Sequence, residues 1–218
     1  MNKIPYLLAL LLTASILFTS CRNGDDDSPP GIGYPTATTD PGVLIGTIDD
    51  RPIRWATRNV NTPGTFAPYS HSTGMLFQWN RRTAWNTTDA QVENWNATPA
   101  EGNTWERTND PCPQGWRVPT IEELTILHGV GYSDFTQQNG VNGYFLGTAP
   151  NRIFLPAPGG RCGKTGVLVS VGVTGGYWSS TKWEHDDTWA RNFNFCSNSF
   201  GMGTGWRGNG SSVRCVAE

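Results

Sequence analysis

The residues best suited to bind a metal ion or a polar ligand are gathered near the C-terminal end of the chain. Glu184, Asp186 and Asp187 place three carboxylates within four residues. Carboxylate oxygens are ligands that Ca²⁺ prefers, but a calcium site also needs carbonyl and carboxylate oxygens from distant parts of the chain. We therefore interpret this segment as a solvated acidic loop that contributes to ligand binding, and we predict no metal centre.

The chain carries no motif that indicates catalysis. Its histidines, His71, His128 and His185, are far apart and lack the i, i+4 or short-loop partner of a zinc site. The GKTG segment at Gly163–Gly166 lacks the upstream glycine and the strand–loop–helix context of a phosphate-binding loop. No serine lies in a GxSxG elbow. We predict a non-catalytic protein without a cofactor.

Tryptophan is frequent, with ten residues in the chain. Several lie in or beside polar loops rich in Asn, Thr and Gly, where an aromatic ring can stack on a sugar or anchor a protein partner. The alternative is that these rings fill gaps beneath long loops. Trp183, beside the acidic loop, and Trp206, in a glycine-rich stretch, are the two best candidates for ligand binding.

The N-terminus predicts an exported, lipid-anchored protein. Residues 1–20 combine Lys3, an apolar run too short to span a bilayer comfortably and small residues at the end, as a signal peptide does. The alternative is an uncleaved anchor helix. The FTSC segment at Phe18–Cys21 resembles a bacterial lipobox, which implies cleavage before Cys21 and acylation of that cysteine. Residues 21–42, rich in Pro, Gly, Thr and Asp, are expected to be a flexible tether.

An acidic run follows the expected lipid anchor. Asp25–Asp27 resembles the surface-export signal of lipoproteins in Bacteroidetes-type bacteria. The alternative is that three aspartates keep the tether soluble and extended. We expect a protein attached to the outer membrane through its N-terminal lipid and exposed at the cell surface.

Four cysteines follow Cys21, an even number in an exported chain, which favours disulfides over metal ligation or free thiols. Three pairings are possible. In the nested pairing, which we favour, Cys112 is bonded to Cys215 and encloses most of the domain. Cys162 is then bonded to Cys196 inside that loop.

The best-marked element is a helix that begins after Pro119. Thr120 is a good N-cap, and Glu123 can bond back to its N–H, which completes a capping box. Apolar residues follow at helical spacing, and Gly129 is expected to stop the helix.

Short strands and long loops are predicted around this helix. A second, short helix is predicted over residues 89–95. The strand candidates lie at residues 43–60 (a hairpin), 74–80, 139–156 (two strands), 167–173, 175–181, 188–195 and 211–217.

Residues 43–218 form the predicted folded domain, and they carry no net charge. Lys3 and Arg22 are the basic residues outside it, and Asp25–Asp27 and Asp40 the acidic ones, which leaves fourteen of each sign inside. A surface that binds nucleic acid must be basic. We therefore expect no nucleic-acid partner.

Five motifs occur in an order that resembles the Fibrobacter succinogenes major paralogous domain family. They are WATRNV, GMLFQWN, CPQGWRVPTIEEL, GGYWSST and SSVRCV, and they extend over nearly all of residues 43–218. The resemblance implies a C-type-lectin-like α+β fold of short, mostly antiparallel strands, one or two helices and long ordered loops, with paired terminal strands. An outer and an inner disulfide agree with the lectin-like pattern. The tryptophans inside these motifs are expected in the core: Trp55, Trp79, Trp116 and Trp178.

The calcium-dependent sugar site of true C-type lectins uses EPN or QPD together with WND, and none of these strings occurs here. We expect a non-catalytic surface lipoprotein that binds a glycan or a protein through loop residues. One alternative is a structural or fimbria-associated envelope subunit. Another is an oxidase like the formylglycine-generating enzymes, which share the broader fold; this predicts free thiols at Cys196 and Cys215. The candidate ligand-binding residues are Trp183, Glu184, Asp186, Asp187 and Trp206.

Overall fold

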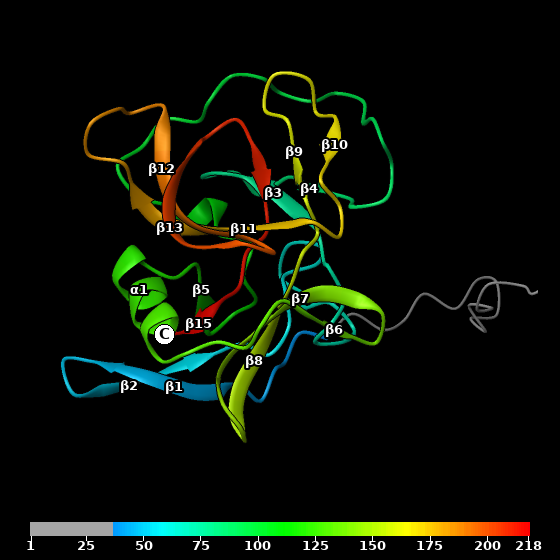
Figure 1. The fold of residues 1–218 in the computed structure, drawn as a ribbon. Coiled ribbons are helices and arrows are strands. Elements are labelled where there is room, and N and C mark those ends of the chain that lie inside the picture. The colour runs from blue at the N-terminus through cyan, green and yellow to red at the C-terminus, as the bar shows by residue number, and fades with distance from the viewer. Residues whose placement is uncertain (1–36) are drawn as a thin grey trace, which may run out of the picture. The chain divides into compact units, whose positions relative to one another are not determined.

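The computed structural model describes residues 37–218. The expected signal peptide, the acylation site at Cys21 and most of the expected tether lie outside the described residues. Within residues 37–218 the fold is α+β, with short strands, one α-helix and one turn of 3-10 helix, η1 (Arg107–Asn109) (Figure 1). No helix in this part of the chain is long and apolar enough to cross a membrane.

The two ends of the folded domain meet in a four-stranded sheet of order β1-β2-β15-β5. β1 (Val43–Ile48) and β2 (Arg51–Trp55) form the predicted hairpin, and both residues of its turn, Asp49–Asp50, have positive φ (48° and 61°). β15 (Val216–Ala217) lies between β2 and β5 (Trp116–Arg117). The last strand therefore pairs with the first hairpin, as expected.

The predicted capped helix is α1 (Ile121–Gly129). Thr120 Oγ1 accepts a hydrogen bond from the Glu123 N–H at 3.3 Å, and the Glu123 carboxylate accepts one from the Thr120 N–H at 2.8 Å. The capping box is therefore confirmed. The predicted stop is one residue early, because Gly129 is still helical and Val130 is the C-cap.

The predicted disulfide between Cys112 and Cys215 is confirmed, and it joins the segment before the helix to the end of the chain. Arg117, on β5, donates from two nitrogens to the two carboxylate oxygens of Glu123, at 2.8 and 2.6 Å. Since Glu123 also caps α1, the helix start, β5 and the C-terminal strand form one cross-linked unit.

Two further sheets have three antiparallel strands each. The first consists of β6 (Thr136–Gln138), β7 (Val141–Thr148) and β8 (Asn151–Pro156). β7 and β8 confirm the two strands predicted within residues 139–156.

The other three-stranded sheet contains a strand that the sequence did not predict. β11 (Thr174–Lys182) and β12 (Trp189–Cys196) confirm predictions, whereas β13 (Ser199–Trp206) was assigned to a glycine-rich stretch. Alternate glycines in β13 hide the apolar periodicity of a strand. A Cβ at Gly205 would lie 2.8 Å from the Trp178 ring, so glycine is what lets β13 cover that tryptophan.

The remaining sheet has five very short strands in the order β10-β9-β14-β3-β4. Their bounds are β10 (Leu168–Val169), β9 (Gly160–Arg161), β14 (Gly210–Ser211), β3 (Leu76–Gln78) and β4 (Ala84–Trp85). The strand predicted over residues 167–173 is thus reduced to β10, and the one predicted over residues 211–217 is divided between β14 and β15.

Residues 86–103, which we call the long loop, contain no helix or strand, so the helix predicted over residues 89–95 is wrong. The Asp89 carbonyl accepts a hydrogen bond from Arg161, and the Ala90 carbonyl accepts one from the Leu168 N–H. These carbonyls bond to other segments of the chain, so they do not join a local helical ladder.

Two clusters of buried side chains form the core. The first packs Leu124 and Leu127 of α1 against the β1–β2 hairpin, β7, β8, β11 and β12. The second includes Trp105, which is 6% exposed although it lies in a polar stretch of the sequence. The four tryptophans predicted to be core are buried: Trp55, Trp79, Trp116 and Trp178.

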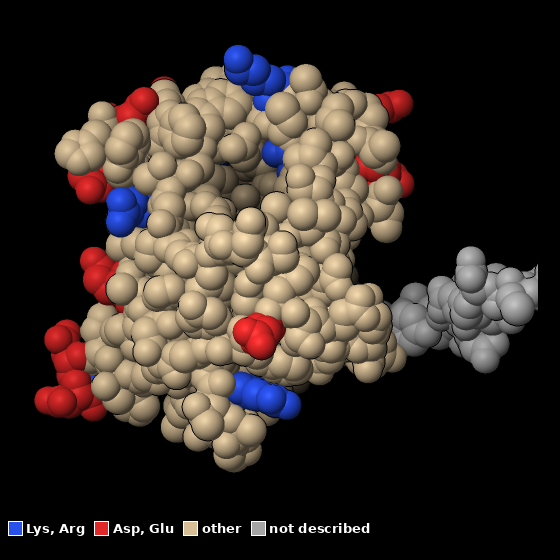
Figure 2. Space-filling model, viewed as in Figure 1, with Lys and Arg blue, Asp and Glu red and all other residues tan. Residues whose placement is uncertain are grey.

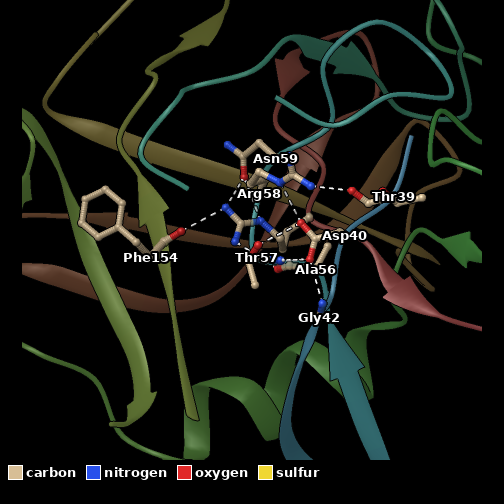
Figure 3. Close-up of polar contacts among 9 residues, drawn as sticks. Thr39, Asp40, Gly42, Ala56, Thr57, Arg58, Asn59 and Phe154 are labelled. Carbon is tan, nitrogen blue, oxygen red and sulfur yellow. Dashed lines mark hydrogen bonds and ion pairs between the residues drawn. The ribbon is translucent and has the colours of Figure 1, made fainter. Parts of the chain in front are cut away.

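Arg214 is fully buried and forms no salt bridge with any of residues 37–218. It donates to Asn59 Oδ1 (2.6 and 3.0 Å) and to the carbonyls of Ala56 (3.2 Å) and Phe154 (2.9 Å). Figure 3 labels these three partner residues. Burial lowers the pKa of Arg214 to about 10. The guanidinium joins segments far apart in sequence by bonding to the Asn59 side chain and to two backbone carbonyls.

Asp40, expected in the tether, belongs to the folded domain. Its carboxylate accepts hydrogen bonds from the Thr57 N–H (2.9 Å), the Thr57 hydroxyl (2.8 Å) and Arg58 Nε (2.9 Å) (Figure 3). Ala37 also forms a β-bridge with Phe66. Residues 37–42 therefore pack with the domain that was expected to begin at residue 43.

Candidate ligand-binding cavity

A cavity of about 640 Å³, which we call the principal cavity, lies between β9 and β14 on one side and β11 and β12 on the other. Figure 2 shows a hollow in this region of the surface, in the area that Figure 1 places between β12 and β9. Much of the lining is backbone, because five of the lining residues are glycine: Gly159, Gly160, Gly175, Gly176 and Gly210.

Glycine shapes this cavity by letting strands approach closely. Gly159 and Gly175 form the parallel bridge that joins the start of β9 to β11. A Cβ at Gly175 would lie 2.2 Å from the Phe195 ring, and one at Gly159 would lie 2.2 Å from the Val169 carbonyl oxygen. A larger residue at either position would push the strands apart.

The side chains in the lining are neutral, apart from Arg161. Phe195 and Val169 are apolar, and amides and hydroxyls stand beside them. Arg161 is 1% exposed, and its guanidinium donates hydrogen bonds to the carbonyls of Asn86 (3.1 and 2.8 Å) and Gly166 (2.6 Å). The cavity therefore suits a ligand without charge. Its polar side chains are Thr174, Asn194, Ser199, Asn209 and Ser211.

Cys162 and Cys196 both line the principal cavity, and both are free thiols, so the predicted disulfide between them is wrong. The sheet register gives the reason. Gly159 pairs with Gly175, and Gly175 pairs with Phe195. β11 therefore lies between the segment that carries Cys162 and the strand that carries Cys196. Adjacent strands are about 4.8 Å apart, so the segment of Cys162 and the strand of Cys196 are separated by about 10 Å. The Cα atoms of a disulfide are at most about 6.8 Å apart, so the two cysteines cannot be bonded.

The two thiols differ in their surroundings. Cys162 is exposed, and hydrogen bonds with the Thr165 side chain and the Lys164 backbone hold its pKa below the usual value. Cys196 is half-buried, and its Sγ lies 3.0 Å from Asn198 Oδ1. Cys162 is therefore the more reactive thiol at neutral pH, since the thiolate is the nucleophile.

The oxidase alternative requires free thiols at both Cys196 and Cys215. Cys196 is free, whereas Cys215 is bonded to Cys112 and fully buried. The thiol pair on which that alternative depends is therefore not present in this structure.

The predicted acidic loop connects β11 to β12. Glu184 is exposed, and Asp187 pairs with Lys182 (Nζ–Oδ1 2.9 Å). Asp186 Oδ1 accepts hydrogen bonds from the hydroxyl and the N–H of Thr188, which lower the pKa of this carboxyl. Within residues 37–218, no group of three or more His, Cys, Asp or Glu side chains is placed to hold a metal ion.

The two candidate tryptophans are separate but share a neighbour. The ring centroid of Trp183 lies 6.3 Å from that of Trp189, and Trp206 is the strand partner of Trp189. The Trp206 ring lies against Gly163 and Gly208, where an added Cβ would come within 2.3 Å of it. Trp206 is half-buried and packs against the chain itself.

None of the five predicted ligand-binding residues lines the principal cavity. The sequence did not single out the residues that do line it, among them Asn194 and Phe195 of β12. An available signal was the glycine pairs Gly159–Gly160 and Gly175–Gly176, because glycine inside a strand marks close approach of a ligand or another backbone. The five predicted residues are Trp183, Glu184, Asp186, Asp187 and Trp206.

Comparison with known proteins adds no relative. No protein-family model matches the chain, no curated protein is similar to it, and no solved structure resembles it. The resemblance of the sequence motifs to the major paralogous domain family therefore stays a prediction.

Proposed function

We propose that this chain is a non-catalytic surface lipoprotein whose lectin-like domain binds a neutral glycan in the principal cavity. The carrying observation is the chemistry of the lining: the apolar side chains of Val169 and of Phe195, which is 3% exposed, amides at Asn194 and Asn209, and no uncommitted charge. Sugar hydroxyls both donate and accept hydrogen bonds, as amides do. The apolar face of a sugar ring packs against an aromatic ring.

The proposed location follows from the N-terminus. The lipobox-like segment ending at Cys21 would attach the mature chain to the outer membrane, and the acidic run Asp25–Asp27 would direct it to the cell surface. The expected tether after Cys21 would separate the lipid from the domain. Such an arrangement presents a ligand cavity to the medium.

A glycan array tests the proposal. Residues 37–218 contain both core clusters, and we expect them to bind a restricted set of neutral glycans with or without a chelator. Asn194→Ala removes an exposed amide of the cavity and should weaken binding about tenfold, the loss expected for one or two hydrogen bonds. Gln137→Ala removes an exposed amide on β6 and should leave binding unchanged. A blank array would contradict the proposal.

A second candidate is an envelope or fimbria-associated subunit, and one observation favours it. Val169, Val171 and Val173 are 45%, 51% and 54% exposed, at alternate positions beside the principal cavity. Exposed apolar residues in a row are typical of protein contacts. This function predicts stable co-purification with envelope proteins that is lost in Val171→Lys, whereas glycan binding predicts saturable binding by the isolated domain.

A further inference from the structure

A second cavity, of about 480 Å³, lies where the long loop meets the end of the β11–β12 loop. We call it the arginine cavity. Residues 98–103 form one wall, and Asp187, Thr188 and Arg207 form the other. It shares no lining residue with the principal cavity.

Arg207 is the buried cation of this cavity, at 1% exposed. Its Nε donates to the Trp189 carbonyl (3.2 Å), and its Nη1 donates to the carbonyls of Ala100 (3.1 Å) and Gly102 (3.0 Å). The guanidinium also stacks on the Trp79 ring, 4.0 Å from its centroid. These contacts fix the orientation of the guanidinium group.

One nitrogen of this group, Nη2, is buried and has no hydrogen-bond partner among the described residues. An unpaired buried donor costs free energy, and the cost is larger when the group is charged. An oxygen atom brought by a ligand would remove that cost. Arg207 is among the residues that line the cavity, and Nη2 is the guanidinium nitrogen that the described residues leave without an acceptor.

Carboxylates in both walls of this cavity restrict which ligand oxygen can bind to Arg207. Glu101 and Asp187 line the cavity, and the Asp187 side chain is 81% exposed. A phosphate, sulfate or carboxylate ligand would accept from Arg207 but would be repelled by these two groups. A hydroxyl can accept from the guanidinium and donate to a carboxylate at the same time.

We propose that the arginine cavity is a second site, which binds a neutral sugar unit through adjacent hydroxyls that accept from Arg207 and donate to Asp187. This extends the proposed glycan-binding function to a separate site, and its test is chosen so that the two can fail independently. Calcium is not required, because the guanidinium supplies the positive charge that orients the sugar.

Saturation-transfer NMR of the full chain in detergent, with neutral methyl glycosides of common hexoses as probes, tests the site. We expect transfer to the sugar ring protons. Asp187→Asn should weaken binding about tenfold, since it removes a charged acceptor. Arg207 is left intact, because it also holds the long loop in place.

Three controls separate the possible outcomes. Glu184→Gln makes the same charge change on the same loop outside the cavity, and Lys182→Met removes the ion pair of Asp187; both should bind as the wild type does. Asn194→Ala weakens only the binding in the principal cavity, so the saturation transfer that is lost in Asp187→Asn should persist in this variant.

Two results would overturn the second site while leaving the proposed function standing. The first is glycoside binding that is lost in Asn194→Ala and retained in Asp187→Asn. The second is an absence of glycoside binding by a protein that is positive on the glycan array. Preferential binding of a methyl glucuronide, which carries a carboxylate, would also overturn it, because the argument from Glu101 and Asp187 requires a neutral ligand.

Discussion

Two regions of this domain are held together by different means. Around α1, the β1–β2 hairpin and β15, order comes from a capping box, strand pairing and the Cys112–Cys215 disulfide. The long loop has no strand or helix of its own, and buried arginines attach it to the rest of the domain. Arg161 bonds to its first residues and Arg207 to its last ones.

The structure around α1 is determined by signals between residues close in sequence, whereas the conformation of the long loop is determined by contacts with residues far away in sequence. Capping and strand periodicity act over a few residues, so they are visible in the sequence. A guanidinium that donates to carbonyls can bind any residue, because every residue has a carbonyl. The long loop is therefore the part of the domain that the sequence predicts least well. It lines the arginine cavity, and it bonds to Arg161 of the principal cavity.

The largest expected effect tests the first region. Removing the disulfide in the double variant Cys112→Ala/Cys215→Ala should lower the free energy of unfolding by about 4 kcal/mol, because the bridge closes a sequence separation of 103 residues. Urea denaturation measures this. Cys162→Ala removes an exposed free thiol and should change stability by less than about 0.5 kcal/mol. An equal loss in both variants would contradict the assignment of Cys162 as free.

The second prediction tests the arginine-held region. Arg207→Met should cost about 3 kcal/mol, because it leaves buried carbonyls of the long loop and Trp189 without their donor. Amide hydrogen exchange should accelerate in residues 98–103 before it does so in α1. Arg81→Met, which loses a hydrogen bond to the exposed Thr98 carbonyl, should cost about 0.5 kcal/mol. Uniform acceleration across the domain would contradict the division into two regions.

Sequence reasoning succeeded where the signal is local and failed where it is not. Thr120 and Glu123 identified the helix start, and the tryptophans of the motifs were correctly placed in the core. β13 was missed because its alternate glycines carry no apolar pattern. The pairing of Cys162 with Cys196 was wrong because a count of cysteines does not show that β11 lies between them. The principal cavity had no local signal beyond its paired glycines.

The third prediction sharpens the contribution of the helix start. Thr120→Ala should destabilise the domain by about 1 kcal/mol, because the Glu123 N–H loses its acceptor at the N-cap. Thr125→Ala, in the middle of α1, should be close to neutral, because alanine is the better helix former there. Thermal unfolding of both variants measures the difference. Similar melting temperatures would show that the cap contributes little.

The smallest expected effect is on acid stability, through Asp40 at the upstream end of the folded domain. Burial alone raises the pKa of this carboxyl, but hydrogen bonds from Thr57, Arg58 and Gly42 lower it below its ordinary value of 3.8. A depressed pKa stabilises the folded state above pH 3.8, and this contribution is lost as the pH falls through the folded-state pKa.

Asp40→Asn should therefore be less stable at neutral pH and should lose less stability below pH 3.8 than the wild type. Denaturation curves measured between pH 2 and pH 7 would show the difference. Parallel curves for the two proteins would contradict the role assigned to Asp40.

The most direct test of the central claim uses the two free thiols as reporters of the principal cavity. Cys162 and Cys196 both line it, so a glycan bound there should slow the alkylation of both by iodoacetamide, measured by mass spectrometry at saturating glycan. We predict protection of both thiols, and about tenfold more glycan should be needed for the same protection in Asn194→Ala. Unchanged alkylation of both thiols in a protein that has bound its glycan would contradict the account.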